Sequence, residues 1–291
     1  MCALCDRILY MHPHHQHTVI LYHGKCPDGF GGAYAAWKKY GDAAEYIPVK
    51  YGGEVPEHME GREIIFIDFC YERADMDAIA KIAESVTVLD HHEGIRDVAT
   101  SFPGVFDANR SGATIAWNYF HPDTPTPRLL SYLEDNDLFR YALPETFDVL
   151  SYIRVLPYKF DAWDTFANKL EDATTRSDFL QKASIYTEHF KLLADISVES
   201  AKKVRFEGYD VAFANTHQTM KSYVGNELYK KFPPFALVVS AHTDGFGVSI
   251  RGDGSVDVSE IAKKYGGNGH PRSSGFFIPA GGPLPWVEIK D

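Results

Sequence analysis

The stretch from Val86 to His92, Val-Thr-Val-Leu-Asp-His-His, decides the fold that we predict for this chain. Its first four residues are apolar or β-branched, which is the pattern of a short strand buried in a parallel sheet. The run then ends in one acid and two imidazoles, groups that a protein core does not accept without partners. Because open α/β sheets bind ligands at the carboxyl ends of their strands, Asp90, His91 and His92 are predicted to face a binding site.

Two further predicted strands end in a group that can bind a metal. Residues 18–22 are mostly apolar and precede His23, and residues 63–67 are mostly apolar and precede Asp68. The segments between these strands suit right-handed crossovers. The carboxyl ends of the three strands are therefore predicted to lie on one edge of a parallel sheet, each with an imidazole or a carboxylate.

The segment after His23 is predicted to be a loop. Residues 24–32 contain four glycines and one proline, and we expect them to lead into a helix over residues 33–40. Strand, Gly-rich loop and helix form the outline of a phosphate site, but this segment matches neither a Walker motif nor a dinucleotide fingerprint. Asp28 stands five residues after His23 at the predicted strand exit. The two are either a loop histidine and a turn aspartate, which is the commoner case for such a pair alone, or a pair of ligands.

The middle of the chain is predicted to be mostly helical. Residues Arg110 to Thr114 open a helix whose first N–H groups suit an anion, although an ordinary capped helix explains them equally well. Glu134 to Asp137 end another helix and are either a solvated turn or the source of a cation ligand. Residues 145–205 carry aromatic side chains at helical spacing, so we expect core helices without chemistry there.

A second α/β pattern begins at Tyr209 and ends in the glycine-rich segment 266–276. Glycines let backbone N–H groups approach an anion closely, and His270 and Arg272 add side-chain donors within the same segment. Arg251 stands at the end of a predicted strand. We therefore expect an anion-binding loop in this part of the chain.

Composition limits the class of protein. The 291 residues, 45% hydrophobic and 24% charged, are typical of a globular protein with room for two domains. The chain shows neither a membrane span nor a signal peptide, and its four irregularly placed cysteines do not form a disulfide framework, so we expect a cytoplasmic location. The net charge of −11 argues against an indiscriminate binder of long nucleic acid. Residues 201–291 hold 11 Lys and Arg against 9 Asp and Glu, so the acidity is concentrated in the first part, where it favours cations.

The first 17 residues carry Cys2-x-x-Cys5 and four histidines between His12 and His17. A zinc site is one interpretation of these residue types. However, no second ligand pair has the spacing of a zinc finger. We therefore predict a flexible N-terminal extension.

The predicted elements resemble the DHH phosphoesterase superfamily, which is named for the Asp-His-His that stands here at Asp90 to His92. The first motif of that family, a strand and a His followed by Pro-Asp, is similar to His23 with the Pro-Asp pair at Asp28. There is one extra residue between His and Pro in this chain. The second motif, an acid that ends a strand, is similar to Asp68.

The resemblance extends over nearly the whole chain from about Thr18. The fourth motif of the family, an Asp followed four residues later by Phe-Arg-aromatic, is similar to Asp135 with Phe139-Arg140-Tyr141. The segment 266–276 is similar to the DHH-associated C-terminal domain of oligoribonuclease and RecJ-like members. The family thus implies a metal-dependent phosphoesterase with a C-terminal substrate-binding domain.

The resemblance also implies roles for individual residues. A pair of divalent cations, usually manganese, would have as ligands His23, Asp28 and Asp68 at one ion and Asp68, His91 and Asp135 at the other. Asp90 would orient the imidazoles, and His92 would contact the phosphate or protonate the leaving oxygen. The groups that bind substrate would be Arg110, Arg251, Gly267, Gly269, His270 and Arg272.

One position departs from the family pattern. A second Asp usually stands two residues after the first, and here that residue is Phe30, which cannot bind a metal. Either Asp137 or Cys26 replaces the missing ligand, or substrate oxygens complete the shell, or one ion is held weakly. The number of bound ions, one or two, stays open at this point.

We predict an α/β protein of four segments with the active site in a cleft between its two α/β domains. The segments are a flexible extension over residues 1–17, a parallel-sheet catalytic domain over 18–145, a helical connector over 146–205 and a smaller α/β substrate-binding domain over 206–291.

The expected function is hydrolysis of short oligonucleotides or of cyclic or linear dinucleotides by a metal-activated water, with Mn²⁺ as the expected metal. One alternative is a phosphatase for small phosphomonoesters, 3′-phosphorylated mononucleotides, pyrophosphate or polyphosphate. Another is a nucleotide-binding sensor with reduced catalysis. We expect neither long nucleic acid nor a membrane as a partner, and the oligomeric state is open, a homodimer included.

Overall fold

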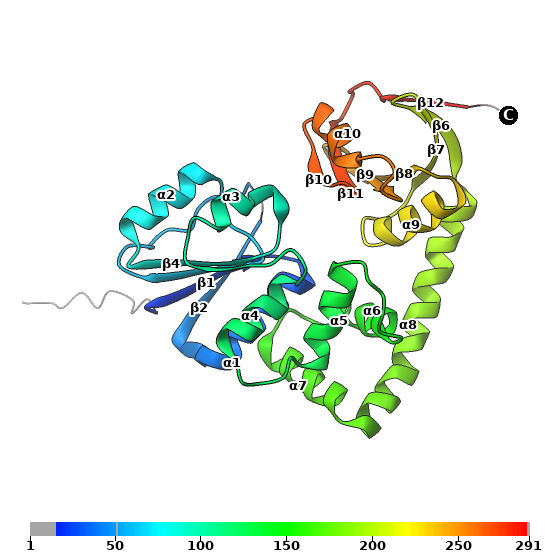
Figure 1. Ribbon diagram of the computed structural model, residues 1–291. Helices are drawn as coiled ribbons and strands as arrows, with labels where there is room; N and C mark the ends of the chain where they lie inside the picture. The colour runs from blue at the N-terminus through cyan, green and yellow to red at the C-terminus, as the bar shows by residue number, and fades with distance from the viewer. Residues whose placement is uncertain (1–15, 51, 290–291) are drawn as a thin grey trace, which may run out of the picture. The chain divides into compact units, whose positions relative to one another are not determined.

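The computed structural model describes residues 16–50 and 52–289, and the chain divides after Leu180 into two compact units. Each unit contains one sheet, and the long helix α8 (Ala173–Glu199) begins in the first unit and ends in the second (Figure 1). The predictions made for residues 1–15, a flexible extension or a zinc site, lie outside the described residues. In the described part of the chain, no helix combines the length and the apolar composition needed to cross a membrane.

The first unit is built on a five-stranded sheet in which all neighbouring strands are parallel, in the order β2-β1-β3-β4-β5. The strands are β1 Thr18–His23, β2 Ala44–Val49, β3 Glu63–Ile67, β4 Ser85–Asp90 and β5 Gly104–Phe106. The prediction of a parallel N-terminal sheet is therefore confirmed.

The register of this sheet aligns the polar strand ends. Tyr22 is paired with Ile67, and Ile67 is paired with Leu89. The residues that follow these three in the chain therefore stand in one row at the carboxyl edge of the sheet: His23, Asp68 and Asp90.

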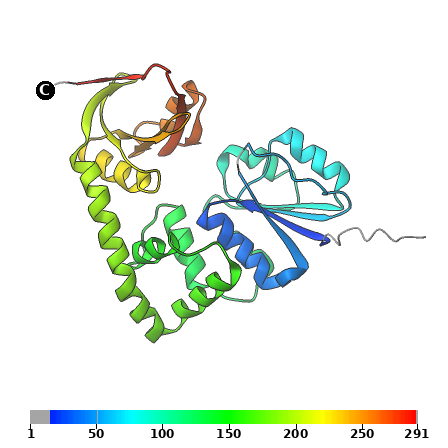
Figure 2. The same ribbon diagram turned by 180° about the vertical axis from the view of Figure 1, so that it is seen from behind.

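Helices cover both faces of this sheet (Figures 1 and 2). The helices of the first unit are α1 Pro27–Tyr40, α2 Arg73–Ile82, α3 Arg96–Ala99, α4 Gly112–Phe120, α5 Arg128–Asp137, α6 Thr146–Ile153 and α7 Phe160–Glu171. On one face, Met76 and Ile79 of α2 and Ala99 of α3 pack into one core with strand residues such as Phe66. On the other face, α1 and α4 pack against each other.

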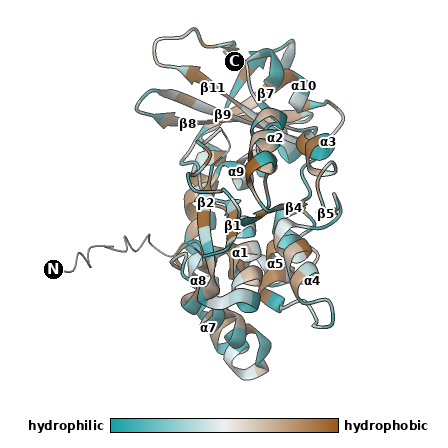
Figure 3. Ribbon diagram, turned by 90° about the vertical axis from the view of Figure 1, so that its left-hand side faces the viewer, coloured by the Kyte–Doolittle hydropathy of each residue, from teal (hydrophilic) through white to brown (hydrophobic). Residues whose placement is uncertain are grey.

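The helices that cover the sheet are amphipathic, as one-sided burial requires. In α2 the buried residues are Met76 and Ile79, while its other positions are exposed or partly exposed. The hydropathy colouring shows hydrophobic and hydrophilic positions close together along such helices (Figure 3). The apolar stripe of α2 faces the sheet and its polar positions face outward.

The helix α1 begins at Pro27, so the prediction of a loop over residues 24–32 is wrong for most of that segment. Its glycines allow close packing rather than a turn. A Cβ on Gly29 would lie 2.3 Å from the carbonyl oxygen of His23, and a Cβ on Gly32 would lie 2.3 Å from Cγ2 of Ile67. Glycine at these positions lets the first turns of α1 lie directly on the strand ends.

The second unit contains a seven-stranded mixed sheet in the order β10-β11-β9-β8-β7-β6-β12. Only the pair of β7 and β8 is parallel. The strands are β6 Lys202–Phe206, β7 Tyr209–Asn215, β8 Phe235–His242, β9 Gly245–Gly252, β10 Asn268–His270, β11 Ser273–Pro279 and β12 Trp286–Glu288. The predicted C-terminal α/β pattern is confirmed, and β6 shows that its sheet begins before residue 206.

Each face of the second sheet has its own hydrophobic core. On one face, α10 (Val258–Lys264) packs onto residues such as Phe206 and Phe235. On the other face, α9 (Lys221–Lys231) and the end of α8 pack onto small strand residues such as Ala212 and Ala236. The sheet is therefore covered on both sides, like the sheet of the first unit.

The segment 266–276 is not the loop that we predict from its glycines. Most of it forms the hairpin of β10 and β11, in which Asn268 pairs with Gly275 and His270 pairs with Ser273. Gly269 has a φ of 142°, and a Cβ there would lie 2.5 Å from Cα of Ser274. Close strand pairing therefore explains these glycines, whereas anion binding is the explanation expected from sequence.

Phe30 is a core residue of the first unit. Its ring is 3% exposed and stacks on the ring of Phe160, with the centroids 5.0 Å apart. The rings of Tyr158 and Trp163 contact its edges at centroid distances of 5.2 and 4.7 Å. The side chain is therefore part of an aromatic cluster that joins α1 to α7.

Replacement of Phe30 tests this position. Phe30→Ala should lower the free energy of unfolding by about 3 to 5 kcal/mol, because it opens a cavity among aromatic rings. Phe30→Asp, which supplies the acid usual in the family, should destabilise at least as much, because it buries an unpaired charge. Urea unfolding followed by circular dichroism measures both effects.

Tyr119→Ala is the matched control, because Tyr119 lies on α4 of the same unit and is 45% exposed. It should change the free energy of unfolding by about 0.5 kcal/mol or less. A Phe30→Asp protein as stable as the wild type would contradict the core position of Phe30.

Candidate metal centre

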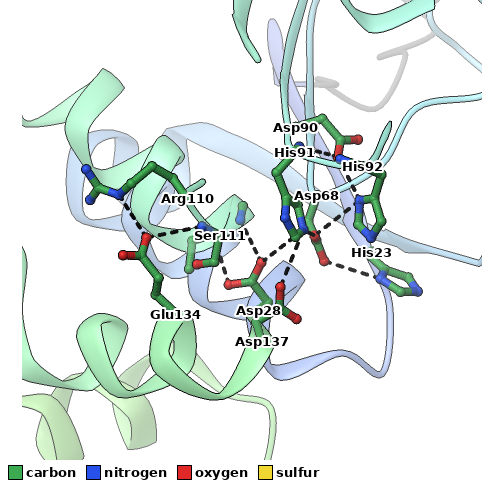
Figure 4. A network of polar contacts seen from close by, with 12 residues as sticks. His23, Asp28, Asp68, Asp90, His91, His92, Arg110, Ser111, Glu134 and Asp137 are labelled. Atoms are coloured by element: carbon green, nitrogen blue, oxygen red, sulfur yellow. Dashed lines mark hydrogen bonds and ion pairs between the residues drawn. The ribbon is translucent and has the colours of Figure 1, made fainter. Parts of the chain in front are cut away.

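The carboxylate of Asp68 lies at the centre of a polar cluster at the strand ends (Figure 4). Its Oδ2 is 3.2 Å from Nδ1 of His23, and its Oδ1 is 3.2 Å from Nε2 of His91. The residue is buried and has a φ of 64°, a left-handed conformation that Asp tolerates better than most residues. A Cβ on Gly112 would lie 2.6 Å from Cβ of Asp68, so glycine is required where α4 begins beside it.

Two more carboxylates approach His91 from the helices α5 and α1. Oδ2 of Asp137 lies 3.5 Å and Oδ2 of Asp28 lies 4.0 Å from Nε2 of His91. Asp28 also accepts hydrogen bonds from the backbone N–H groups of Gly112 (2.7 Å) and Ala113 (3.2 Å). The N-terminal end of α4, with its free N–H groups and positive dipole end, therefore fixes this carboxylate.

Among the described side chains of metal-ligand type at the strand ends, three groups have their ligand atoms within 4.8 Å of one another, and one of them is Asp68, Asp90, His91 and His92. Of the other two, the first group is His23, Cys26 and Asp68, and the second is Asp28, His91 and Asp137. Asp68 links them, since its two oxygens contact one imidazole of each group. Ligand atoms at about 2 Å from one ion are roughly 3 to 4 Å apart, so the spacing suits divalent cations.

Electrostatics in the cluster also favours a cation. Burial and the charge of Asp68 raise the pKa of Asp28 well above its ordinary value, and the same two causes raise the pKa of Asp137 to about 6. Burial alone would lower the pKa of His91, but the carboxylates of Asp68, Asp137 and Asp28 outweigh it and raise that pKa to about 9. The cluster therefore holds an excess of acidic groups that divalent cations would neutralise.

The atoms in the cluster fit a bound metal. Nε2 of His91 is buried and has no aligned hydrogen bond to any described residue, although it is surrounded by carboxylates. Although burial favours the neutral acid, the imidazoles of His23, His91 and His92 hold the pKa of Asp68 well below its ordinary range. A charged carboxylate and a buried imidazole nitrogen fit a cation, which would displace the proton that the neighbouring carboxylates favour on His91.

Asp90 organises the turn that carries the two histidines. Its Oδ1 accepts hydrogen bonds from the backbone N–H groups of His91 (2.6 Å) and His92 (3.0 Å) and lies 2.8 Å from Nδ1 of His92. Burial lowers the pKa of His92, but Asp90 and Asp68 raise it by more, so the net pKa lies above the ordinary value. These contacts fix the ring of His92 and favour its protonated form.

The structure places Asp137, and not Asp135, in the cluster. The carboxylate of Asp135 accepts hydrogen bonds from the N–H groups of Ala142 (2.8 Å) and Leu143 (3.1 Å) and from the hydroxyl of Thr146 (2.5 Å). It thereby fixes the turn between α5 and α6 instead of facing His91. The family resemblance implies Asp135 at the second ion, whereas Asp137 is the acid of α5 that lies beside His91.

The direction in which side chains point around α5 explains why Asp137, and not Asp135, lies beside His91. A Cβ on Gly31 of α1 would meet side-chain carbons of both Leu133 and Leu130, so this face of α5 lies directly against α1. Asp137 is one turn beyond Leu133, and Asp28 is one turn before Gly31. The two acids therefore meet at the same end of the helix pair.

The residues of the first motif are grouped differently from what the resemblance implies. The resemblance implies Asp28 at one ion with His23 and Asp68, but the ligand-type neighbours of Asp28 are His91 and Asp137. Cys26 completes the group of His23 and Asp68, and Asp68 also lies in the group of Asp90, His91 and His92. Phe30, which marks the departure from the family pattern, lies in the aromatic core described above.

Arg110 lies beside the cluster and takes part in a separate ion pair (Figure 4). Its Nε donates to Oε2 of Glu134 at 2.8 Å, and the same oxygen accepts the N–H of Ser111 at 3.1 Å. Arg140 donates to the other oxygen of Glu134 at 3.0 Å. This network fixes the start of α4, so Arg110 has a structural partner in addition to its expected contact with substrate.

The second unit contains a hollow of about 440 Å³ on its sheet. Arg251 and Gly269, both expected to bind substrate, line it, whereas Gly267, His270 and Arg272 do not. The side chain of Arg272 lies against Gly254 instead. None of the residues that line the hollow is acidic, which suits an anionic ligand.

Several residues of this hollow carried no signal in the sequence. Besides Arg251, its polar lining includes Gln218, Lys221, Ser240, His242 and Asn268. They come from separate elements, and only the pairing of β8, β9 and β11 with α9 beside them brings them together. The Arg251 guanidinium is buried and donates to Oγ of Ser222 at 3.1 Å, which fixes it at the edge of α9.

No protein-family model matches the chain. The chain is 30% identical over 304 residues to the uncharacterized protein R106 of Acanthamoeba polyphaga mimivirus, and the match covers 95% of this chain and 71% of that protein. An identity of this size over nearly the whole chain shows common descent.

Solved structures share the fold. The pGpG-specific phosphodiesterase PggH from Vibrio cholerae is 13% identical, with a TM-score of 0.52 over 91% of this chain and 94% of that one. RecJ from Thermus thermophilus, in complex with Mn²⁺, is 14% identical, with a TM-score of 0.53 over 90% of this chain and 49% of that one. A DHH domain from a member of a family of ribosomal proteins is 11% identical, with a TM-score of 0.56 over 90% of this chain and 82% of that one. The chain therefore belongs to one family with the mimivirus protein R106 and has the fold of the DHH phosphoesterase superfamily.

Proposed function

We propose that this chain is a metal-dependent phosphodiesterase that hydrolyses short oligonucleotides or cyclic or linear dinucleotides. The observation that carries the proposal is the pair of ligand groups linked by Asp68, whose oxygens are each 3.2 Å from an imidazole nitrogen. Two linked cation sites are the usual arrangement for displacement at phosphorus. Mn²⁺ is the cation that we expect, since RecJ of the same fold binds it.

The residues of the cluster have distinct parts in the proposed reaction. Bound cations would supply activation of the attacking water and neutralisation of the phosphate charge. His92, fixed by its 2.8 Å contact to Asp90 and favoured in its protonated form, would donate a hydrogen bond to the phosphate or a proton to the leaving oxygen. Its side chain is 24% exposed, more than that of His91, and is therefore more accessible to substrate.

The substrate class is proposed from charge and size. The net charge of −11 disfavours binding along a long polyanion. The hollow of about 440 Å³ with Arg251 and Lys221 in its lining has the size of a small-molecule site and no acid in its lining. We propose that it binds the phosphate or nucleoside at the far end of a short substrate. PggH, which has the same fold and is a pGpG-specific phosphodiesterase, supports a dinucleotide.

Product analysis tests the proposed function. The purified chain, with Mn²⁺ or with chelator, is given a linear dinucleotide, longer oligomers, a cyclic dinucleotide, a 3′-phosphorylated mononucleotide and pyrophosphate. We expect Mn²⁺-dependent cleavage of diester bonds, fastest for the shortest linear substrate, with products separated by chromatography. Asp68→Asn should be inactive, because both ligand groups lose the carboxylate that links them.

Two outcomes would replace the proposal with another function. Phosphate released only from the monoester or from pyrophosphate would identify a phosphatase. Nucleotide binding without turnover of any compound would identify a sensor.

A pair of substitutions tests which acid of α5 binds metal. Asp137→Asn should weaken Mn²⁺ binding by about 10- to 100-fold, because it removes a carboxylate from the group with His91. Asp135→Asn should leave Mn²⁺ binding unchanged and lower the free energy of unfolding by about 1 to 3 kcal/mol, because Asp135 accepts three hydrogen bonds at the turn after α5. Equilibrium dialysis with elemental analysis measures the bound metal.

Asp123→Asn is the control for these variants, because Asp123 is an exposed acid of the same unit. It should change neither metal content nor stability. Loss of Mn²⁺ in Asp135→Asn together with full binding in Asp137→Asn would restore Asp135 as the ligand.

The hollow of the second unit predicts an effect on substrate binding. Lys221→Gln should raise KM for a dinucleotide by about tenfold and leave kcat nearly unchanged, because Lys221 lines the hollow and belongs to none of the groups of metal-ligand type. His270→Ala should have a smaller effect, since this residue does not line the hollow. Steady-state kinetics measures both variants. A loss of kcat with unchanged KM in Lys221→Gln would argue against the hollow as the substrate site.

A further inference from the structure

Cys26 stands directly in front of the first helix, within the candidate metal centre. It is the residue that precedes Pro27 in α1, and it has extended backbone angles of φ −111° and ψ 129°. Its Sγ lies within 4.8 Å of a ligand atom of both His23 and Asp68. A thiol, an imidazole and a carboxylate therefore meet at the end of β1.

The start of α1 explains why Cys26, and not Phe30, is the neighbour of Asp28 in the cluster. Successive residues of an α-helix are rotated by about 100°, so two residues that are two positions apart point in nearly opposite directions. Asp28 and Phe30 both lie within α1; accordingly, one faces His91 and the other faces the aromatic core. Cys26 precedes the helix and is free of this constraint. It can therefore share the cluster with Asp28.

We propose that the thiolate of Cys26 is a metal ligand, so that the ion held by His23, Cys26 and Asp68 has nitrogen, sulfur and oxygen donors. This proposal rests on the metal centre of the proposed function and identifies the ligand that makes its two halves different. The other group, Asp28, His91 and Asp137, has two carboxylates and one imidazole. The two halves would therefore differ in the cations that they prefer.

Other roles of Cys26 explain less of the structure. As a helix cap it would account for the N–H of Gly29 that acts on its sulfur, but not for the imidazole and the carboxylate beside it. As a core residue it would be surrounded by apolar groups, but the charges of Asp68, Asp28 and Asp137 act on it. Burial and these charges raise the pKa of its thiol, so a bound cation would displace the thiol proton. Nε2 of His91 in the adjacent group is buried without an aligned hydrogen bond to any described residue, which independently indicates that a ligand belongs in this cluster.

Cys70 provides the contrast that isolates the position of Cys26. It is 3% exposed and belongs to the hydrophobic core beneath α2, together with Phe69 and Tyr71. It is in none of the groups of ligand atoms found among the described residues. Cys70 therefore supplies a second thiol of the same unit that should not bind metal.

The sulfur donor should shift the preference of the first ion. Thiolate ligands favour zinc and other softer cations, whereas carboxylates and water suit Mg²⁺ and Mn²⁺. The half with Cys26 should thus prefer Zn²⁺ or Co²⁺ more strongly than the half with Asp28. A centre that holds two different metals is the expected consequence.

Cobalt absorption tests the proposal without a measurement of activity. The full chain is prepared with Cys2→Ser and Cys5→Ser, so that these cysteines contribute no signal, and is titrated with Co²⁺. A cobalt–thiolate bond gives a strong charge-transfer band in the near ultraviolet. We expect this band in the parent protein and in Cys70→Ser, and we expect its loss in Cys26→Ser. The bound Co²⁺ is counted in parallel by elemental analysis.

The outcomes separate this proposal from the proposed function. Co²⁺ bound without the band, or a band that persists in Cys26→Ser, would overturn the thiolate ligand even if the chain hydrolyses dinucleotides. A band that depends on Cys26 would support the ligand even if none of the phosphate compounds is cleaved. A failure to bind Co²⁺ in a parent protein shown by circular dichroism to be folded would overturn the ligand and the metal centre together.

A second variant tests metal preference. Cys26→Asp replaces the sulfur by a carboxylate and should shift the competition between Zn²⁺ and Mn²⁺ toward Mn²⁺ by about tenfold or more. Competition dialysis with both metals measures this ratio in the parent protein, Cys26→Asp and Cys70→Ser. An unchanged ratio in Cys26→Asp would contradict a direct sulfur–metal bond.

Discussion

The placement of one buried carboxylate, that of Asp68, is the constraint on which the first unit depends. The parallel register puts it level with His23 and Asp90, and its left-handed backbone turns the chain away immediately after β3. Gly112 has no side chain where the start of α4 meets it. Asp68 follows β3, the strand between β1 and β4, so its carboxylate can reach the imidazoles of His23 and His91. The sheet register, the turn after β3 and the start of α4 all fix the position of this one side chain.

The surrounding helices offset the cost of concentrating acids at this point. Asp28 is held by two N–H groups at the start of α4, and this start is itself tied to Glu134. Gly31 allows α1 and α5 to approach, which brings Asp137 next to Asp28. Without a cation, burial and the charge of Asp68 raise the pKa of both Asp28 and Asp137. A bound cation would therefore stabilise the charged forms of these acids.

The parallel sheet and its polar edge could be predicted from sequence, because apolar runs that end in His23, Asp68 and Asp90 have a direct physical meaning in an open sheet. Residues inside helices were predicted less well. The position in the family motif points to Asp135 as the metal ligand. In the structure Asp135 turns toward the N–H of Ala142, and Asp137 is the acid of α5 that faces His91. Glycines in α1 and in the hairpin of β10 and β11 allow close packing against neighbouring segments. These neighbours could not be predicted from sequence, because only the fold brings them together.

The two units differ in charge in a way that would set the order of binding. The cluster at Asp68 contains more carboxylates than imidazoles, so bound cations would be needed to make it attractive to an anion. The hollow with Lys221 and Arg251 contains no acid in its lining, so in the proposed function it would attract an anion with or without metal. A phosphate substrate would therefore bind to the second unit at any time, whereas it would enter the first unit only after the metal. Cation availability, more than substrate affinity, would then decide when the proposed enzyme is active.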